Sequence, residues 1–192
     1  MTPKSSAIFT IGHSTHSIDA FIALLQQHSV TALADVRSAP YSRFNPQFNK
    51  EALMRKLPYG IKYVFLGREL GAQPDDQSCY ENGRVQYRRL AQTELFRGGI
   101  ERVRKEASEC HIALMCAEKE PLDCHRTLLV AHDFYGQGVE VMHILCNGGL
   151  EQHWDSLNRL LKMWKLAEPE LWRSVDERIA EALKLQERKV VG

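Results

Sequence analysis

Five short apolar runs, separated by segments with helical periodicity, constrain the fold of this sequence more than any other feature. The runs cover residues 7–11, 31–36, 61–66, 111–116 and 139–145. Polar residues do not alternate with apolar ones in these runs, which is typical of strands that are buried on both faces of a parallel sheet. We therefore predict an α/β fold with three layers, a mostly parallel central sheet of about five strands, and additional C-terminal helices.

Capping residues and glycines indicate where the intervening helices begin and end. Ser17 is the expected N-cap of a helix over residues 18–28. The helical pattern of residues 84–108 is expected to break near Gly98 and Gly99. Two amphipathic helices are expected after residue 150. We predict an α/β core domain over residues 1–149 and a helical extension over residues 150–192, packed on the core.

Composition and charge narrow the class of protein. The chain has 192 residues, 44% of them apolar, and a formal net charge of +1, so its overall charge does not indicate nucleic acid or a membrane as a partner. No apolar run approaches the roughly 20 residues that a membrane helix needs, and we expect no signal peptide. Five cysteines at irregular spacing do not form a disulfide framework. We expect a cytoplasmic protein with reduced thiols.

Polar and reactive residues follow the predicted strands at the points where the strands end. In an open parallel sheet, ligands bind in the crevice beyond these carboxyl ends. The residues placed there are His13 and Ser14, then Asp35, Arg37 and Ser38, and finally Cys116, Glu118, Cys124, His125 and Arg126. The sequence therefore predicts one site at this edge of the sheet.

The segment Cys124-His125-Arg126 is expected to open a helix, with Asp123 as its N-cap. Free N–H groups and neighbouring cations at such a turn lower the pKa of a thiol. We expect Cys124 to be a nucleophile and His125 its activator, while a general acid or base comes from Asp35 or Glu118.

The two arginines that follow the second and fourth strands, Arg37 and Arg126, are expected to hold an anion. Inert packing of the cysteines, and structural ion pairs of Arg126 with Glu118 or of Arg37 with Asp35, are alternative interpretations of the same residues.

A zinc site made by Cys116, Cys124, His125 and His13 is a further alternative, although the spacing of the two cysteines is not that of common zinc motifs. No nucleotide-binding glycine motif or Walker lysine is present. We therefore expect no bound cofactor and no metal.

Four ordered stretches resemble a known family. "TIGHST", "ADVRSAPYSRFNPQF", "YVFLGRELGAQP" and "LMCAEKEPLDCHR" are similar to the prokaryotic family called domain of unknown function 488, over roughly residues 7–145. The resemblance implies an α/β fold and a shared pocket but no settled activity. The residues that it implicates are His13, Ser14, Asp35, Arg37, Ser38, Tyr63, Gly67, Gly71, Cys116, Glu118, Cys124, His125 and Arg126.

These observations favour an enzyme, either a hydrolase or a group transferase, that acts on an anionic substrate such as a nucleotide or nucleic acid. His13, Ser14, Ser38 and Tyr63 would join Arg37 and Arg126 in binding it. A non-catalytic module that binds phosphate or nucleic acid is the alternative, because residues 84–105 hold seven basic residues against two acidic ones. A scaffold that binds partners through its C-terminal helices is a third hypothesis. The sequence does not indicate an oligomeric state.

Overall fold

The computed structural model describes residues 7–191, and its central feature is a six-stranded sheet with the order β3-β2-β6-β1-β7-β8. The strands are β1 (Ile8–Gly12), β2 (Ala32–Asp35), β3 (Lys62–Phe65), β6 (Ile112–Cys116), β7 (Val141–Ile144) and β8 (Leu150–Gln152). All neighbouring pairs are parallel except β7 and β8. The predicted α/β fold is therefore confirmed, and the antiparallel edge strand β8 is the strand that the apolar pattern did not reveal.

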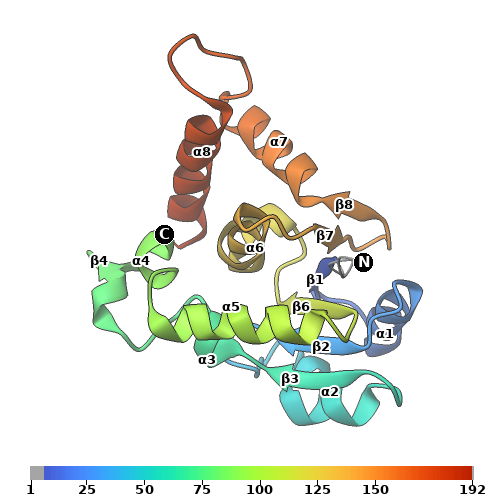
Figure 1. Cartoon of the computed structure of the whole chain (residues 1–192). Helices are drawn as coiled ribbons and strands as arrows, with labels where there is room; N and C mark the ends of the chain where they lie inside the picture. Colours follow the sequence, from blue (N-terminus) through green and yellow to red (C-terminus); the bar gives the residue numbers. More distant parts are fainter. Residues whose placement is uncertain (1–6, 192) are drawn as a thin grey trace.

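The register of the sheet brings three strand ends to one edge. Gly12 at the end of β1 lies opposite Cys116 at the end of β6, and Asp35 at the end of β2 lies opposite Met115. The polypeptide that leaves each of these strands therefore enters the same region of the molecule (Figure 1).

Helices cover both faces of the sheet and bury two separate apolar clusters. On one face, α1 (Ile18–Gln27) and α2 (Lys50–Lys56) pack with the short 3-10 turn η1 (Pro46–Phe48) against alternate strand residues such as Leu33 and Met115. The other face is covered by α3 (Gly67–Leu70), α5 (Glu94–Ala107), the π-helical turn η4 (Arg126–Ala131) and α6 (His132–Gly136). As predicted, Ser17 caps α1, since its side chain accepts a hydrogen bond from the Ala20 N–H.

The two C-terminal helices, α7 (His153–Met163) and α8 (Val175–Val190), pack over η4 and α6 (Figure 1). Leu157, Leu160 and Ile179 on these helices belong to the same apolar cluster as the strand residues Ala34 and Leu114. The expected C-terminal helices are thus present and share the core with the sheet. In the described residues, none of the helices combines the length and the apolar character that a membrane span requires.

The expected break near Gly98 and Gly99 is wrong, because α5 runs through both glycines. The interruption lies earlier, between α4 (Tyr87–Leu90) and the Thr93 side chain that caps α5. A β-carbon on Gly99 would lie 2.8 Å from both the Glu69 Cβ and the Leu70 Cδ2 atoms. Gly99 is therefore a point of close helix packing rather than a helix end.

The segment between β3 and α4 also contains regular structure. It begins with α3 and continues with the 3-10 turn η2 (Gln77–Cys79) and a small hairpin of β4 (Tyr80–Glu81) and β5 (Arg84–Val85). This hairpin lies beside α8 and reaches the carboxyl edge of the sheet (Figure 1).

Candidate active site

The segment that carries Cys124 differs from the expected helix start. A 3-10 turn, η3 (Pro121–Asp123), ends at Asp123, and Cys124 is extended with φ −138° and ψ 137°. The carbonyl of Cys124 accepts the N–H of Leu128 at 3.1 Å, and its sulfur accepts the N–H of Arg126 at 3.4 Å. Cys124 therefore does what an N-cap residue does, and the prediction that Asp123 is the N-cap is wrong.

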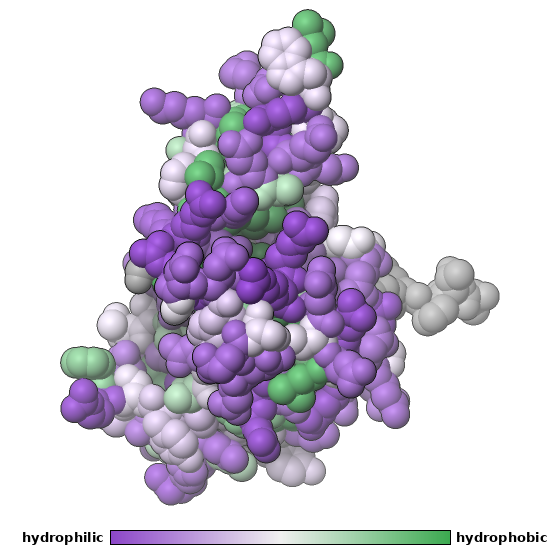
Figure 2. All heavy atoms as spheres, turned by 90° about the vertical axis from the view of Figure 1, so that its left-hand side faces the viewer, coloured by the Kyte–Doolittle hydropathy of each residue, from purple (hydrophilic) through white to green (hydrophobic). Residues whose placement is uncertain are grey.

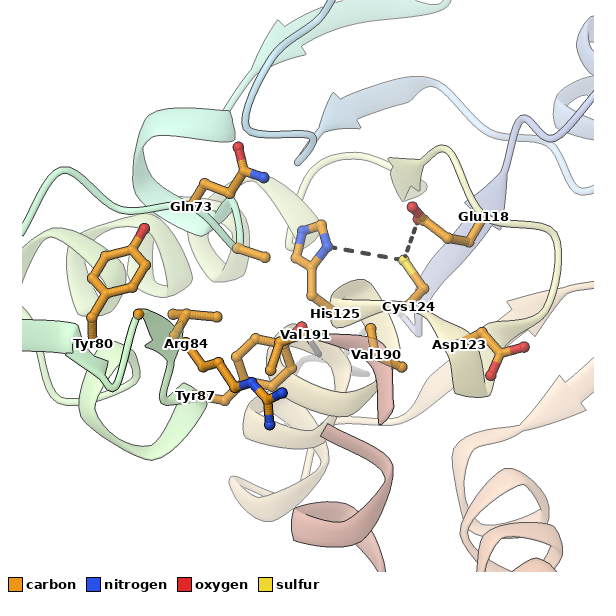
Figure 3. Close-up of a pocket in the computed structure, with 13 residues that line it drawn as sticks. Gln73, Tyr80, Arg84, Tyr87, Glu118, Asp123, Cys124, His125, Val190 and Val191 are labelled. Carbon is orange, nitrogen blue, oxygen red and sulfur yellow. Dashed lines mark hydrogen bonds between the residues drawn. The ribbon is translucent and has the colours of Figure 1, made fainter. Parts of the chain in front are cut away.

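Three side chains surround the sulfur of Cys124, and Figure 3 shows two of them, Glu118 and His125. Its Sγ atom lies 2.9 Å from Oε2 of Glu118 and 4.0 Å from Nδ1 of His125. The Sγ atom of Cys116 lies 3.6 Å from the same nitrogen. Cys116 and Cys124 are buried, whereas Glu118 is exposed, so its carboxylate reaches from the surface to a buried sulfur.

The backbone carbonyl of Val36, the residue directly after β2, fixes the orientation of His125. Its Nε2 atom donates to the Val36 carbonyl at 3.0 Å, an assignment that follows from the hydrogen-bond pattern. The Nδ1 atom is consequently the one that faces both sulfurs.

The two thiols differ in their electrostatic environment. Burial opposes ionisation of Cys124, but the hydrogen bond with Cys116 and the charges of Arg126 and His125 outweigh it and hold the pKa of Cys124 well below its usual value. Burial, together with the neighbouring Cys124 thiolate, raises the pKa of Cys116. Burial disfavours charge on His125 as well, yet the bond to Cys124 raises the pKa of the imidazole. Cys124 is therefore the thiol of this pair that ionises first.

Arg126 is a buried cation beside this pair. Its side chain is 0% exposed, and it donates to the carbonyls of Glu118 at 2.7 Å and Lys119 at 3.4 Å. Within residues 7–191 its Nε atom has no hydrogen-bond partner and the guanidinium forms no ion pair with a carboxylate. The charge of Arg126 favours ionisation of the neighbouring Cys124 thiol and lowers its pKa.

Gly12 allows the Glu118 loop to approach the end of β1. A β-carbon at position 12 would lie 1.8 Å from the Glu118 carbonyl oxygen and 3.1 Å from an Arg126 nitrogen. Only glycine fits there without displacing the backbone that presents Glu118.

A second buried network lies on the β2 side of the edge. Arg37 binds Asp35 through Nε at 2.9 Å and NH2 at 2.6 Å, and the Tyr63 hydroxyl donates to the same carboxylate at 2.8 Å. The remaining terminal nitrogen of Arg37, NH1, lies 3.3 Å from Nε2 of His13. Burial lowers the pKa of His13 to about 4, so its neutral ring accepts from Arg37 while Nδ1 donates to the Ser14 carbonyl.

Two cavities, each about 360 Å³, meet beside Gln73, Glu118 and His125. The Cys124 cavity is also lined by Tyr80, Arg84, Tyr87, Asp123, Cys124, Val190 and Val191 (Figure 3). The Arg37 cavity is also lined by His13, Arg37, Ser38, Tyr41, Ser42, Asn45 and Cys116. Residues from distant parts of the chain thus share one divided cleft.

The predicted site residues occupy two positions relative to this cleft. His13, Arg37, Ser38, Glu118, Cys124 and His125 line it. Ser14, Asp35, Tyr63 and Arg126 are not among its lining residues; Asp35, Tyr63 and Arg126 bond to groups around it.

The family model described as "Domain of unknown function DUF488" matches residues 17–132, which is more than half of the chain. The chain belongs to the DUF488 family. No curated protein and no solved structure matches it. In this DUF488 protein the match includes the Cys124 segment, while α7 and α8 lie beyond it.

Sequence reasoning missed the wall that α8 and the β4–β5 hairpin contribute to the cleft. The sequence indicates Arg84 only as part of a basic stretch, and it does not single out Val190. The amphipathic pattern of α8 shows that one face is buried, but it does not show against which segment.

One group of side chains in the described part of this DUF488 protein has the donors and the spacing for a metal ion. The ligand atoms of Cys116, Cys124 and His125 lie within 4.8 Å of one another. His13, the fourth residue of the zinc alternative, is outside this group, and its Nε2 atom faces Arg37.

Proposed function

We propose that this DUF488 protein is an enzyme, a hydrolase or group transferase with Cys124 as its nucleophile, acting on an anionic substrate. The observation that carries the proposal is the 2.9 Å contact between the Cys124 sulfur and the Glu118 carboxylate at a cavity wall. A thiol next to a positioned base is the arrangement that nucleophilic catalysis requires.

Cys124 forms the bond to the substrate, and Glu118 accepts and returns the proton. The Cys124 S–H proton passes to Glu118, and the sulfur forms a bond to the electrophilic centre of the substrate. The leaving group departs with its bonding electron pair and takes the proton from Glu118. Water, or a second acceptor, then cleaves the bond to sulfur and regenerates the thiol. His125 positions the sulfur, and the buried charge of Arg126 stabilises its thiolate.

The Arg37 cavity is the part of the cleft that supports an anionic substrate. Because Asp35 engages Nε and NH2 of Arg37, the terminal nitrogen NH1 is the one that faces His13 and the cavity. Ser38 and His13 line the same cavity. We assign substrate binding to these three residues, and a positioning role to Asp35, Tyr63 and Ser14. Arg126, buried against carbonyl groups, acts on the thiolate rather than on the substrate.

The alternative of a nucleic-acid-binding module has less support. Three of the basic residues on which it depends, Arg89, Arg102 and Arg104, form ion pairs with Glu81, Glu69 and Glu101. The face of the molecule that carries this region is largely hydrophilic (Figure 2), which is also the usual character of a solvated surface.

The test is a panel of activated phosphate, sulfate and carboxylate esters offered to the full chain, with turnover and covalent adducts followed by absorbance and intact mass. We expect Cys124→Ala to abolish both turnover and adduct, and Glu118→Gln to slow turnover by roughly 10²- to 10⁴-fold. Cys146→Ser, a change at an exposed thiol, is the matched control and should have no effect. Turnover that survives in Cys124→Ala would exclude the assigned nucleophile.

A further inference from the structure

We propose that Cys116, Cys124, His125 and Glu118 form a site for one Zn²⁺ ion, and that zinc held there inhibits the enzyme by occupying Cys124. The existence of the site is independent of the proposed function, whereas the inhibition rests on it. The nucleophile mechanism uses Cys116 only indirectly, through its hydrogen bond to Cys124, and gives it no reaction of its own.

The first argument is the spacing of the donor atoms. Zinc in a tetrahedral site lies about 2.3 Å from sulfur and 2.0–2.1 Å from nitrogen, so its ligand atoms are about 3.5–3.8 Å apart. The Nδ1 atom of His125 lies 3.6 Å from the Cys116 sulfur and 4.0 Å from the Cys124 sulfur. The three ligand atoms lie within 4.8 Å of one another.

Glu118 supplies the fourth donor. One of its carboxylate oxygens already lies 2.9 Å from the Cys124 sulfur, closer than two ligands of one zinc ion need to be. Glu118 lies outside the group of three donors within 4.8 Å of one another, so its side chain must shift to reach the ion. Because Glu118 is on an exposed loop, it can move without disturbing the core.

The second argument is the hydrogen bond behind His125. A histidine that binds a metal almost always donates its other ring N–H to a carbonyl or carboxylate, which fixes the tautomer and the ring. His125 does this through the 3.0 Å bond from Nε2 to the Val36 carbonyl. Its Nδ1 lone pair is therefore aimed at the space between the two sulfurs.

The third argument is charge. Zn²⁺ with two thiolates, one carboxylate and a neutral imidazole carries a net charge of −1. Arg126, with a fully buried side chain that pairs with carbonyl oxygens, supplies a charge of +1 next to this group. Its backbone N–H also donates to the Cys124 sulfur, a bond that a metal-bound thiolate retains. The zinc complex and Arg126 together are neutral, which favours burial of both.

Inhibition follows from the same geometry. A sulfur that donates its lone pair to zinc is not available to attack a substrate, and Glu118 on zinc is not available to accept a proton. Removal of zinc would restore both groups. The metal would therefore act as an off-switch rather than as the reacting centre.

The test begins with the full chain, reduced and freed of metal, titrated with Co²⁺ and then with Zn²⁺. We expect thiolate-to-cobalt charge-transfer absorption that saturates at one ion per chain and disappears when zinc is added. Cys116→Ser should weaken the affinity by more than roughly 100-fold, since even residues behind a ligand contribute 10- to 100-fold. Cys146→Ser is the control and should bind as the parent chain does.

Two further measurements on the parent chain test the zinc site even if Cys116→Ser does not fold. X-ray absorption of the zinc-loaded parent chain should show two sulfur ligands and two lighter ones. Zinc should also slow alkylation of Cys124, measured by peptide mass, in the parent chain. Absence of the charge-transfer band, or a zinc shell without sulfur, would overturn the site. The ester panel on the metal-free chain tests the nucleophile separately, so the two proposals fail independently.

Discussion

Gln186 of α8 donates two hydrogen bonds from one nitrogen, to the Asp123 carboxylate and to the Leu122 carbonyl, both at 2.9 Å. Its side-chain oxygen accepts the indole N–H of Trp164 at 3.1 Å. Gln186 is fully buried, and Asp123 directly precedes Cys124. The C-terminal helix thereby fixes the turn that carries Cys124.

Replacement of Gln186 by alanine should lower the free energy of unfolding by about 1–3 kcal/mol, because it leaves buried polar groups without partners. Urea denaturation followed by circular dichroism measures the change. Lys189→Ala is the matched control, since Lys189 contacts the same carboxylate at 3.3 Å from an exposed position and should cost less than about 1 kcal/mol. Equal losses in the two variants would contradict the role of Gln186.

A buried row of imidazoles predicts that the protein loses stability in mild acid. His143 bonds to Thr10 at 2.8 Å and to His153 at 3.0 Å, and His153 lies 3.4 Å from His132. Burial lowers the pKa of His143 to about 3 and that of His153 to about 2. Arg126 and Arg159 also disfavour the charge on His143.

Because the unfolded chain binds these protons near pH 6.5 and the folded chain does not, stability is full above that pH and falls as the pH falls below it. Each histidine should contribute a slope of about 1.4 kcal/mol per pH unit below pH 6. Denaturation between pH 7.5 and pH 5 measures this slope for the parent chain and for His153→Gln. In the variant, the change of stability with pH should be smaller by about 1.4 kcal/mol per pH unit, which is the contribution of one histidine. An unchanged slope would show that His153 is protonated in the folded protein.

Gly98 and Gly99 should respond in opposite directions to alanine. Nothing lies within 4 Å of a β-carbon at Gly98, so Gly98→Ala should stabilise α5 by about 0.5–1 kcal/mol. At Gly99 the new methyl group would meet α3 at 2.8 Å, and overpacking of this kind costs about 1–3 kcal/mol. Thermal unfolding of the two variants provides the comparison. A stabilising Gly99→Ala would show that α3 does not pack against Gly99 at this distance.

Asp35 and Tyr63 offer a matched pair for the network around Arg37. Asp35→Asn removes the charge partner of a buried arginine and should cost about 3–5 kcal/mol. Tyr63→Phe removes one hydrogen bond to the same carboxylate and should cost about 1 kcal/mol. Equilibrium unfolding in urea measures both. Similar costs would show that Arg37 does not depend on Asp35 for its burial.

The carboxyl edge of the sheet could be predicted because each apolar run ends at a residue of contrasting chemistry. Buried parallel strands have a local signature, and the direction of such strands places their ends together. Arg37 and His125 line one cavity at that edge, and Cys124 lines the adjoining one.

Details that depend on contacts between distant segments could not be predicted. The N-cap is Cys124 rather than the predicted Asp123, because the Asp123 side chain is held by Gln186, which lies 63 residues later. The helix does not break at Gly98 and Gly99 as predicted, because α3 packs on α5 at that point. Strand β8 has only three residues, and its pairing with β7 rather than its own composition defines it.

The place of β1 between β6 and β7 has a consequence for how the chain folds. Phe9 pairs with Ala113 on one side and Met142 on the other, so both neighbours of β1 lie more than 100 residues ahead of it. Loop closure over such separations is slow, and β1, which is synthesised before β6 and β7, keeps both hydrogen-bonding edges unpaired until those two strands emerge from the ribosome. Nascent chains of this protein should therefore be clients of chaperones that shield unpaired strands.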